Sequence, residues 1–274
     1  MGAVWKRNEM DKAHSSNAIY AKYTAPVAEI IINAPERRNA LNLAMWAALP
    51  SLVAEAEQAE EIRAIILHGG DSGHFAAGAD ISEFADVYAD EAASATSADT
   101  IAQALEALVD CQKPIIAAIE GACVGGGVSL ALACDIRIAS EDARFGVTPA
   151  RLGLVYPAKD TCRLVETVGA ALAKDILFTG RIFDAARALR IGLIEDICDP
   201  GTALKVARER AATIADVSQY SVREMKKMIS AFDSPAGLSP AEGRQIFLDA
   251  AAGDDFKEGY RAFLEKRKPD FPSS

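Results

Sequence analysis

The sequence is poor in the residues that bind metal ions or form disulfides. Its three histidines are His14, His68 and His74, and none has a second histidine four residues away, as a helical metal site would require. The five cysteines are an odd number with no C-x-x-C pair, and most stand in apolar stretches. We therefore predict no metal site, and expect reduced core thiols in a reducing compartment.

Long apolar runs and an excess of positive charge are also missing. No run approaches the length of a membrane span, and the first residues do not resemble a signal peptide, so we expect a cytoplasmic protein that does not enter a membrane. The formal charge of -10 argues against nucleic acid as the main partner. A small phosphorylated ligand is still allowed, because it needs only a few local cations.

What is present is enough for a large folded core. The chain has 274 residues, of which 50% are hydrophobic. Short apolar runs that are typical of strands cover 19–23, 28–32, 62–68, 114–119 and 135–138, and they alternate with turns and helical patterns. This alternation predicts an α/β fold with parallel strands and right-handed crossovers.

The two ends and one central segment follow other patterns. We expect residues 1–17 to form a flexible arm, 18–200 the core, and 201–274 a helical region that packs on the core or on another subunit. Within that region, Ser239-Pro240-Ala241-Glu242 has the pattern of a helix start. Residues 83–100 are polar and lack strong periodicity, which predicts a mobile loop.

Two glycine-bearing segments are the most informative part of the chain. They are Phe75–Ile81, FAAGADI, and Gly121–Leu130, GACVGGGVSL, and each follows an apolar run and opens a helical pattern. If the fold brings them together, their backbone N–H groups would point at one negative oxygen. Close packing alone is the simpler explanation for either segment taken singly. Neither has the spacing of a dinucleotide or nucleotide phosphate loop.

Together these segments resemble the enoyl-CoA hydratase/isomerase (crotonase) family. Further similar motifs follow the family's order along the chain: NAPERRNALN at 33–42, ARFG at 143–146 with Leu152-Gly153, Thr179-Gly180 with Gly192-Leu193, and FLEKR at 263–267. The resemblance implies a core of repeated ββα units wound as a spiral, followed by a helical C-terminal region. It also implies a coenzyme A thioester as substrate, no bound cofactor, and self-association as a trimer or a dimer of trimers.

The resemblance also implies roles for individual residues. The amides of Ala79 and Gly126 would bind the thioester oxygen and stabilise an enolate. Ala40, Ala77 and Ile81 would wall the adenine pocket. Arg37 or Arg38 would meet a CoA phosphate, although simple solvated charge explains either arginine equally well. Phe263 and Lys266 would reach the CoA of a neighbouring subunit. Asp80 we expect to cap the helix that begins there.

The chain departs from the family at the positions of its two catalytic glutamates. Ser129 stands at the first and Pro149 at the second, and neither can act as a carboxylate base. TPARLGLVY at 148–156 is similar to the same stretch of the family's methylmalonyl-CoA decarboxylases, where a tyrosine lies near the reacting carboxylate. Those enzymes, however, carry a histidine where this chain has Ala79.

The candidates for moving a proton are therefore Tyr156, Ser129 and Asp160. Each has a structural alternative: a core aromatic for Tyr156, a bond to a helix carbonyl for Ser129, and a cap or ion pair for Asp160. We expect an acyl-CoA enzyme, with lyase chemistry (including decarboxylation) ahead of isomerisation and of two-glutamate hydration. The rival is a catalytically degenerate member that binds acyl-CoA or acts as a scaffold.

Overall fold

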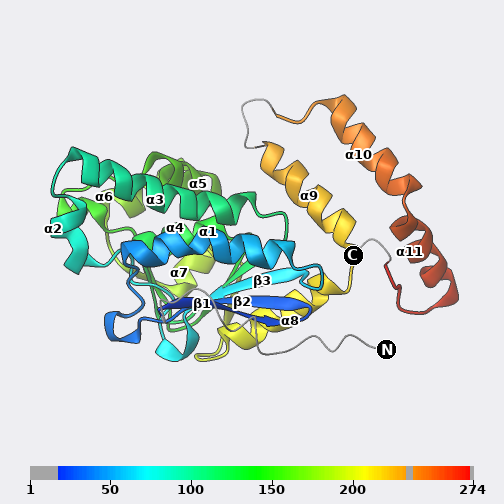
Figure 1. Ribbon diagram of the computed structural model, residues 1–274, viewed down its shortest axis with the longest axis horizontal. Coiled ribbons are helices and arrows are strands. Elements are labelled where there is room, and N and C mark those ends of the chain that lie inside the picture. Colours follow the sequence, from blue (N-terminus) through cyan, green and yellow to red (C-terminus); the bar gives the residue numbers. More distant parts are fainter. Residues whose placement is uncertain (1–17, 233–236, 272–274) are drawn as a thin grey trace, which may run out of the picture.

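The computed structural model describes residues 18–232 and 237–271 of the chain (Figure 1). The predicted flexible arm over residues 1–17 lies outside the described residues. The helical region from residue 201 onward is helical as predicted, whereas its division from the core at residue 200 stays a prediction. In the part of the chain that the structure describes, no helix is long and apolar enough to cross a membrane.

A six-stranded sheet lies at the centre, in the order β1-β2-β3-β4-β6-β9. Its strands are β1 (Ile19–Thr24), β2 (Val27–Ile32), β3 (Ala64–His68), β4 (Ile115–Ile119), β6 (Ile136–Ser140) and β9 (Asp196–Cys198). β1 and β2 form an antiparallel hairpin, and each later pairing is parallel, as the alternating pattern predicts. β3 and β4 are buried along their whole length, which is typical of parallel strands covered on both faces.

Helices cover both faces of this sheet (Figure 1). On one side lie α1 (Leu43–Gln58), α3 (Glu91–Asp110) and α4 (Gly126–Ala133), which share the larger core with Ile65 and Leu67 of β3. On the other side α8 (Ala203–Ala215) packs on Ala64 and Ile66 of the same strand. The fully buried residues of α8 in this second core are alanines spaced four apart, so the helix approaches the sheet closely.

A smaller sheet gives the fold its repeated unit. It consists of β5 (Ala122–Val124), β7 (Arg144–Gly146) and β8 (Phe183–Asp184), with β5 and β7 parallel. β4, β5 and α4 form one ββα unit. β6, β7 and α5 (Ala158–Val168) form the next. The predicted core of repeated ββα units is confirmed, and each unit passes from the large sheet through the small sheet to a helix.

The prediction that residues 83–100 form a mobile loop is wrong. The segment forms the short helix α2 (Phe84–Val87) and the first half of α3. The Asp90 side chain caps α3 by accepting a hydrogen bond from the Ala93 N–H. The periodicity is weak because the buried face is made partly of small residues, Ser97 and Ala104, before Leu105 and Leu108 continue it.

The C-terminal part is helical. After α6 (Ala170–Thr179) and α7 (Ala185–Arg190), the chain ends in α9 (Gln219–Phe232), α10 (Pro240–Ala252) and α11 (Asp254–Glu265). These last three helices extend away from the layered core (Figure 1). The predicted helix start is confirmed, because Ser239 and Glu242 form a reciprocal capping box at α10.

Candidate functional site

The two glycine segments lie against each other. The Phe75 N–H donates to the Glu120 carbonyl at 2.7 Å, and the Ala76 N–H donates to the Ala122 carbonyl at 2.9 Å. The Val124 N–H then donates back to the Ala76 carbonyl at 3.0 Å. The first segment therefore runs beside β5 as an extra short strand, and it delivers residues 77–80 to the start of α4.

Glycine is required here by backbone contact. A Cβ atom at Gly127 would lie 2.2 Å from the Ala76 carbonyl oxygen. At Gly78, where φ is +104°, a Cβ would lie 2.9 Å from the Val124 carbonyl oxygen and 3.4 Å from the Gly126 nitrogen. Both contacts are with backbone that a side-chain rotation cannot relieve. Only glycine lets the two segments approach this closely.

The backbone also sets the direction of the Ala79 N–H. Leu41 bridges the residues on either side of Ala79: its N–H donates to the Gly78 carbonyl at 2.8 Å, and its carbonyl accepts from the Asp80 N–H at 2.9 Å. Because neighbouring residues of an extended chain point their polar groups in opposite directions, the Ala79 N–H faces away from Leu41. No motif or spacing in the sequence indicates this positioning role of Leu41.

The Gly126 N–H comes from the first residue of α4, where a helix has no internal acceptor for it. In the described part of the chain, neither the Ala79 N–H nor the Gly126 N–H has a backbone acceptor. The Ala79 nitrogen lies 3.6 Å from the point where a Cβ on Gly126 would stand. Two unpaired donors thus lie side by side at the positive end of a helix, an arrangement suited to a negative oxygen.

Trp46 of α1 forms a wall beside these donors, and sequence reasoning missed it. Its Cζ2 atom lies 3.1 Å from the Cβ position of Gly126, and its side chain is only 1% exposed. Among the described residues its indole N–H has no hydrogen-bond partner. The periodicity of α1 marks Trp46 as a core residue, but gives no sign that the core reaches the glycine segments at this point.

Asp80 caps the next turn, as predicted. Its carboxylate accepts from the Ser82 N–H at 3.0 Å and the Ser82 hydroxyl at 2.7 Å. The Arg37 guanidinium lies 2.8 Å from its other oxygen. These hydrogen bonds, from Ser82 first and then Arg37, hold the pKa of the Asp80 carboxyl below its usual range. Asp80 is therefore an ionised structural group, and Arg37 is held by it.

The residues predicted to hold coenzyme A come from two adjacent segments. The Ala77 N–H donates to the Arg38 carbonyl at 3.0 Å, so residues 37–41 run alongside residues 77–80. Ala40 and Ala77 are partly exposed, and Arg38 and Ile81 are exposed. These five positions (Arg37, Arg38, Ala40, Ala77 and Ile81) therefore gather at one accessible rim beside the glycine segments.

Phe263 and Lys266 are not brought to this rim within one chain. Phe263 lies on α11 with 81% of its surface exposed, and Lys266 ends that helix in a left-handed conformation. α11 belongs to the group of helices that extends away from the core (Figure 1). A role for either residue at a neighbouring subunit's site stays a prediction.

Ser129 and Tyr156 meet inside the protein. Their side-chain oxygens are 2.7 Å apart, and the Ser129 hydroxyl also lies 2.8 Å from an oxygen of Asp160. Ser129 therefore bonds to two side chains rather than to the helix carbonyl that its position in α4 suggests. The Tyr156 hydroxyl is satisfied locally, as the structural alternative for it expects. Burial, and next the charge of Asp160, raise the pKa of Tyr156, so it is a neutral phenol.

Asp160 forms an ion pair with the Arg163 guanidinium at 3.0 Å, as one alternative for it predicts. Arg163 also pairs with Glu106 of α3, and Lys159 binds the same carboxylate at 2.9 Å. Burial raises the pKa of the Asp160 carboxyl above its usual range, while Ser129 and Arg163 oppose that effect. Because α3 and α5 supply this network from distant parts of the chain, sequence spacing does not reveal it.

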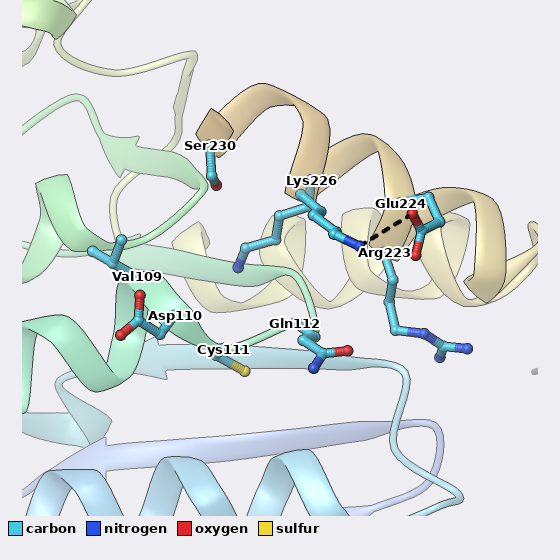
Figure 2. A pocket seen from close by; sticks show the side chains of 9 residues that line it. Val109, Asp110, Cys111, Gln112, Arg223, Glu224, Lys226 and Ser230 are labelled. Carbon is cyan, nitrogen blue, oxygen red and sulfur yellow. Dashed lines mark ion pairs between the residues drawn. The ribbon is translucent and has the colours of Figure 1, made fainter. Parts of the chain in front are cut away.

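A cavity of about 330 Å³ lies elsewhere, and none of the predicted site residues lines it. The end of α3 and the following residues form one side, and Arg223, Glu224, Lys226, Lys227 and Ser230 of α9 form the other (Figure 2). The Lys226 ammonium donates to the Lys113 carbonyl and binds Asp135 at 2.7 Å. Burial raises the pKa of Cys111 in its wall to about 11. These contacts fasten α9 to the core and leave no reactive thiolate there.

Comparison with known proteins agrees with this geometry. The family model for enoyl-CoA hydratase/isomerase matches residues 22–274. The chain is 36% identical over 247 residues to the 2,3-dehydroadipyl-CoA hydratase of Escherichia coli, covering 88% of this chain and 93% of that one. It is 34% identical over 254 residues to the short-chain-enoyl-CoA hydratase of Clostridium acetobutylicum, covering 92% and 96%.

Solved structures agree as well. A member of the same family from Hyphomonas neptunium superposes with a TM-score of 0.90 at 55% identity, covering 94% of this chain and 98% of that one. The protein belongs to the enoyl-CoA hydratase/isomerase family and has the crotonase fold. It is accordingly an enzyme of the family that acts on acyl-CoA thioesters.

Proposed function

We propose that this protein is an acyl-CoA lyase whose reaction passes through a thioester enolate. The observation that carries the proposal is a pair of amides, Ala79 N–H and Gly126 N–H, which lie side by side at the start of α4 and have no backbone acceptor among the residues that the structure describes. As charge leaves the α-carbon, it collects on the thioester oxygen, and two amides aimed at that oxygen bind the enolate more tightly than the substrate.

Proton transfer falls to hydroxyl groups in this proposal, because Ser129 and Pro149 stand at the two glutamate positions. Ser129 lies three residues after Gly126, so about one helical turn of α4 separates the enolate oxygen from its hydroxyl. Tyr156, bonded to Ser129, is the proposed donor to the α-carbon. A buried neutral phenol suits protonation of an enolate better than activation of water. This favours decarboxylation over isomerisation, and isomerisation over two-glutamate hydration.

Coenzyme A would bind along the rim already described. Arg37 and Arg38 are the proposed cations for its phosphates, with Ala40, Ala77 and Ile81 against the adenine. The substrate itself supplies the thioester, and the proposed reaction uses no bound cofactor.

The proposed assembly is a trimer or a dimer of trimers. Support comes from large exposed apolar side chains on the three terminal helices: Met225, Ile229, Phe247, Leu248, Phe256, Tyr260, Phe263 and Leu264. Such a surface is unusual on a monomer and typical of a subunit interface. In this arrangement Phe263 and Lys266 would reach the CoA of a neighbouring subunit. Sedimentation of the full chain tests the assembly, and a monomer would contradict it.

A mass-spectrometric screen of acyl-CoA thioesters tests the reaction. Malonyl-type thioesters should lose carbon dioxide, and 2-enoyl thioesters should gain water slowly or not at all. Rapid hydration would instead assign the activity named for the E. coli and C. acetobutylicum relatives. Tight binding of thioesters by calorimetry, with no turnover of any of them, would favour a binding or scaffold role.

A further inference from the structure

Three buried groups form a continuous hydrogen-bonded path that includes Ser129, about one helical turn after Gly126 in α4. The path runs from the Tyr156 hydroxyl to the Ser129 hydroxyl at 2.7 Å, and from there to the Asp160 carboxyl at 2.8 Å. Tyr156 is 7% exposed, Ser129 3% and Asp160 2%. Few water molecules can therefore reach these groups, so a proton passes between them along the hydrogen bonds rather than through bulk water.

The direction of the hydrogen bonds depends on whether Asp160 carries a proton. Ionised Asp160 can only accept, so Ser129 donates to it and Tyr156 donates to Ser129. Protonated Asp160 donates to Ser129, which then donates to Tyr156. In this second state the Tyr156 O–H is released from Ser129 and is free to donate to another acceptor. Each hydroxyl has a single hydrogen, so the two hydrogen bonds must reverse together.

We propose that Asp160 is the proton store of this site and exchanges its proton with the α-carbon of the thioester through Ser129 and Tyr156. This inference rests on the proposed function. On protonation of the enolate, the Tyr156 O–H bond breaks as the α-carbon C–H bond forms. Tyr156 takes the Ser129 proton and Ser129 takes the Asp160 proton. The enolate loses its negative charge, and Asp160 becomes a carboxylate, so atoms and charge balance.

The surroundings of Asp160 suit both protonation states. Arg163 binds its other oxygen and stabilises the carboxylate, but the same guanidinium is shared with Glu106. Lys159 binds Glu106 from the exposed side. Asp80 and Asp160 each bind an arginine, but their pKa values shift in opposite directions. Hydrogen bonds from Ser82 and Arg37 lower the pKa of Asp80. Burial raises the pKa of Asp160. Asp80 therefore stays ionised, whereas the surroundings of Asp160 allow it to gain and lose a proton.

Exchange of α-protons for deuterium tests the relay without knowledge of the natural acyl group. Butyryl-CoA is incubated with the full chain in D₂O buffers of different pH, and loss of the α-proton signal is followed by NMR. Abstraction requires ionised Asp160. The exchange rate of the wild-type chain should therefore rise with pH through an apparent pKa above the usual aspartate range. Asp160→Asn should lower the rate by about 10²–10⁴-fold and remove this rise.

Ser129→Ala cuts the path while leaving Asp160 in place, and should give the same loss of rate and of pH dependence. The double variant should lose no more than either single variant, because the three groups act as one unit. Glu166→Gln is the matched control, since Glu166 is an exposed acid on the same helix. If Asp160→Asn does not fold, the pH profile of Ser129→Ala decides the question by itself.

The outcomes separate the relay from the proposed function. Calorimetry with butyryl-CoA should give the same affinity for all variants. Wild-type exchange that persists unchanged in Asp160→Asn or Ser129→Ala overturns the relay and leaves the proposed function standing. Binding without any wild-type exchange also overturns the relay. Failure of the wild-type chain to bind any CoA thioester overturns the proposed function itself.

Discussion

Replacement of Gly126 by proline removes one of the two proposed donors. Gly126 is the first residue of α4, where proline is well tolerated because that N–H has no acceptor within the helix. Loss of one such donor typically costs about 3 kcal/mol of transition-state stabilisation, or roughly 10²-fold in kcat. The Cβ of any replacement would stand 3.1 Å from Trp46 Cζ2, which adds about 1–3 kcal/mol of crowding to the folded state.

Gly126→Ala is the matched control, because it introduces the same Cβ and keeps the N–H. We expect both variants to unfold at similar temperatures in a thermal melt. In steady-state assays with whichever thioester is turned over, Gly126→Pro should show a kcat roughly 10²-fold below that of Gly126→Ala. Equal kcat values for two folded variants would refute the role given to the Gly126 amide.

Three further predictions concern packing, pH and assembly. Gly127→Ala places a Cβ 2.2 Å from the Ala76 carbonyl oxygen and should lower stability by about 3 kcal/mol or more, measured by urea unfolding; wild-type stability would contradict the close approach. Contacts with His68 first, and then with Arg208, together lower the pKa of Glu29 from 4.5 to about 2. The stability that this carboxylate contributes is therefore complete above about pH 4.5 and lost as the pH falls toward 2. Glu29→Gln should be about 2–3 kcal/mol less stable at neutral pH, with the difference vanishing in acid, and a constant difference would refute this assignment. Phe247 on α10 is 71% exposed. The substitution Phe247→Ser should weaken self-association, as measured by sedimentation. An unchanged assembly would place the interface elsewhere.

The parts of the fold that depend on local residue patterns could be predicted from the sequence. The buried strands β3 and β4 and the capping box at Ser239 follow from residue type and spacing alone. The same holds for the cap that Asp80 forms, because its partner Ser82 is two residues away. The pairing of the two glycine segments was predicted from the resemblance to a family, because the hydrophobic periodicity of the sequence does not indicate which segments meet.

The features that could not be predicted from the sequence depend on contacts between elements that are distant along the chain. The helix over residues 91–100 has a buried face of small residues, so its hydrophobic pattern is faint. Arg163 joins Asp160 of its own helix to Glu106 of α3, 57 residues earlier. The positioning bridge from Leu41 to Ala79 likewise joins segments whose proximity only the folded chain defines.

The claim at the centre of this account is that the Ala79 and Gly126 amides polarise a thioester carbonyl. Infrared difference spectroscopy with a CoA thioester labelled with ¹³C at that carbonyl measures this polarisation directly. Two hydrogen bonds should move the carbonyl stretch of the bound thioester to a lower frequency than in water, and Gly126→Pro should reverse part of the change. A bound thioester whose carbonyl stretch is the same as in water would contradict the account.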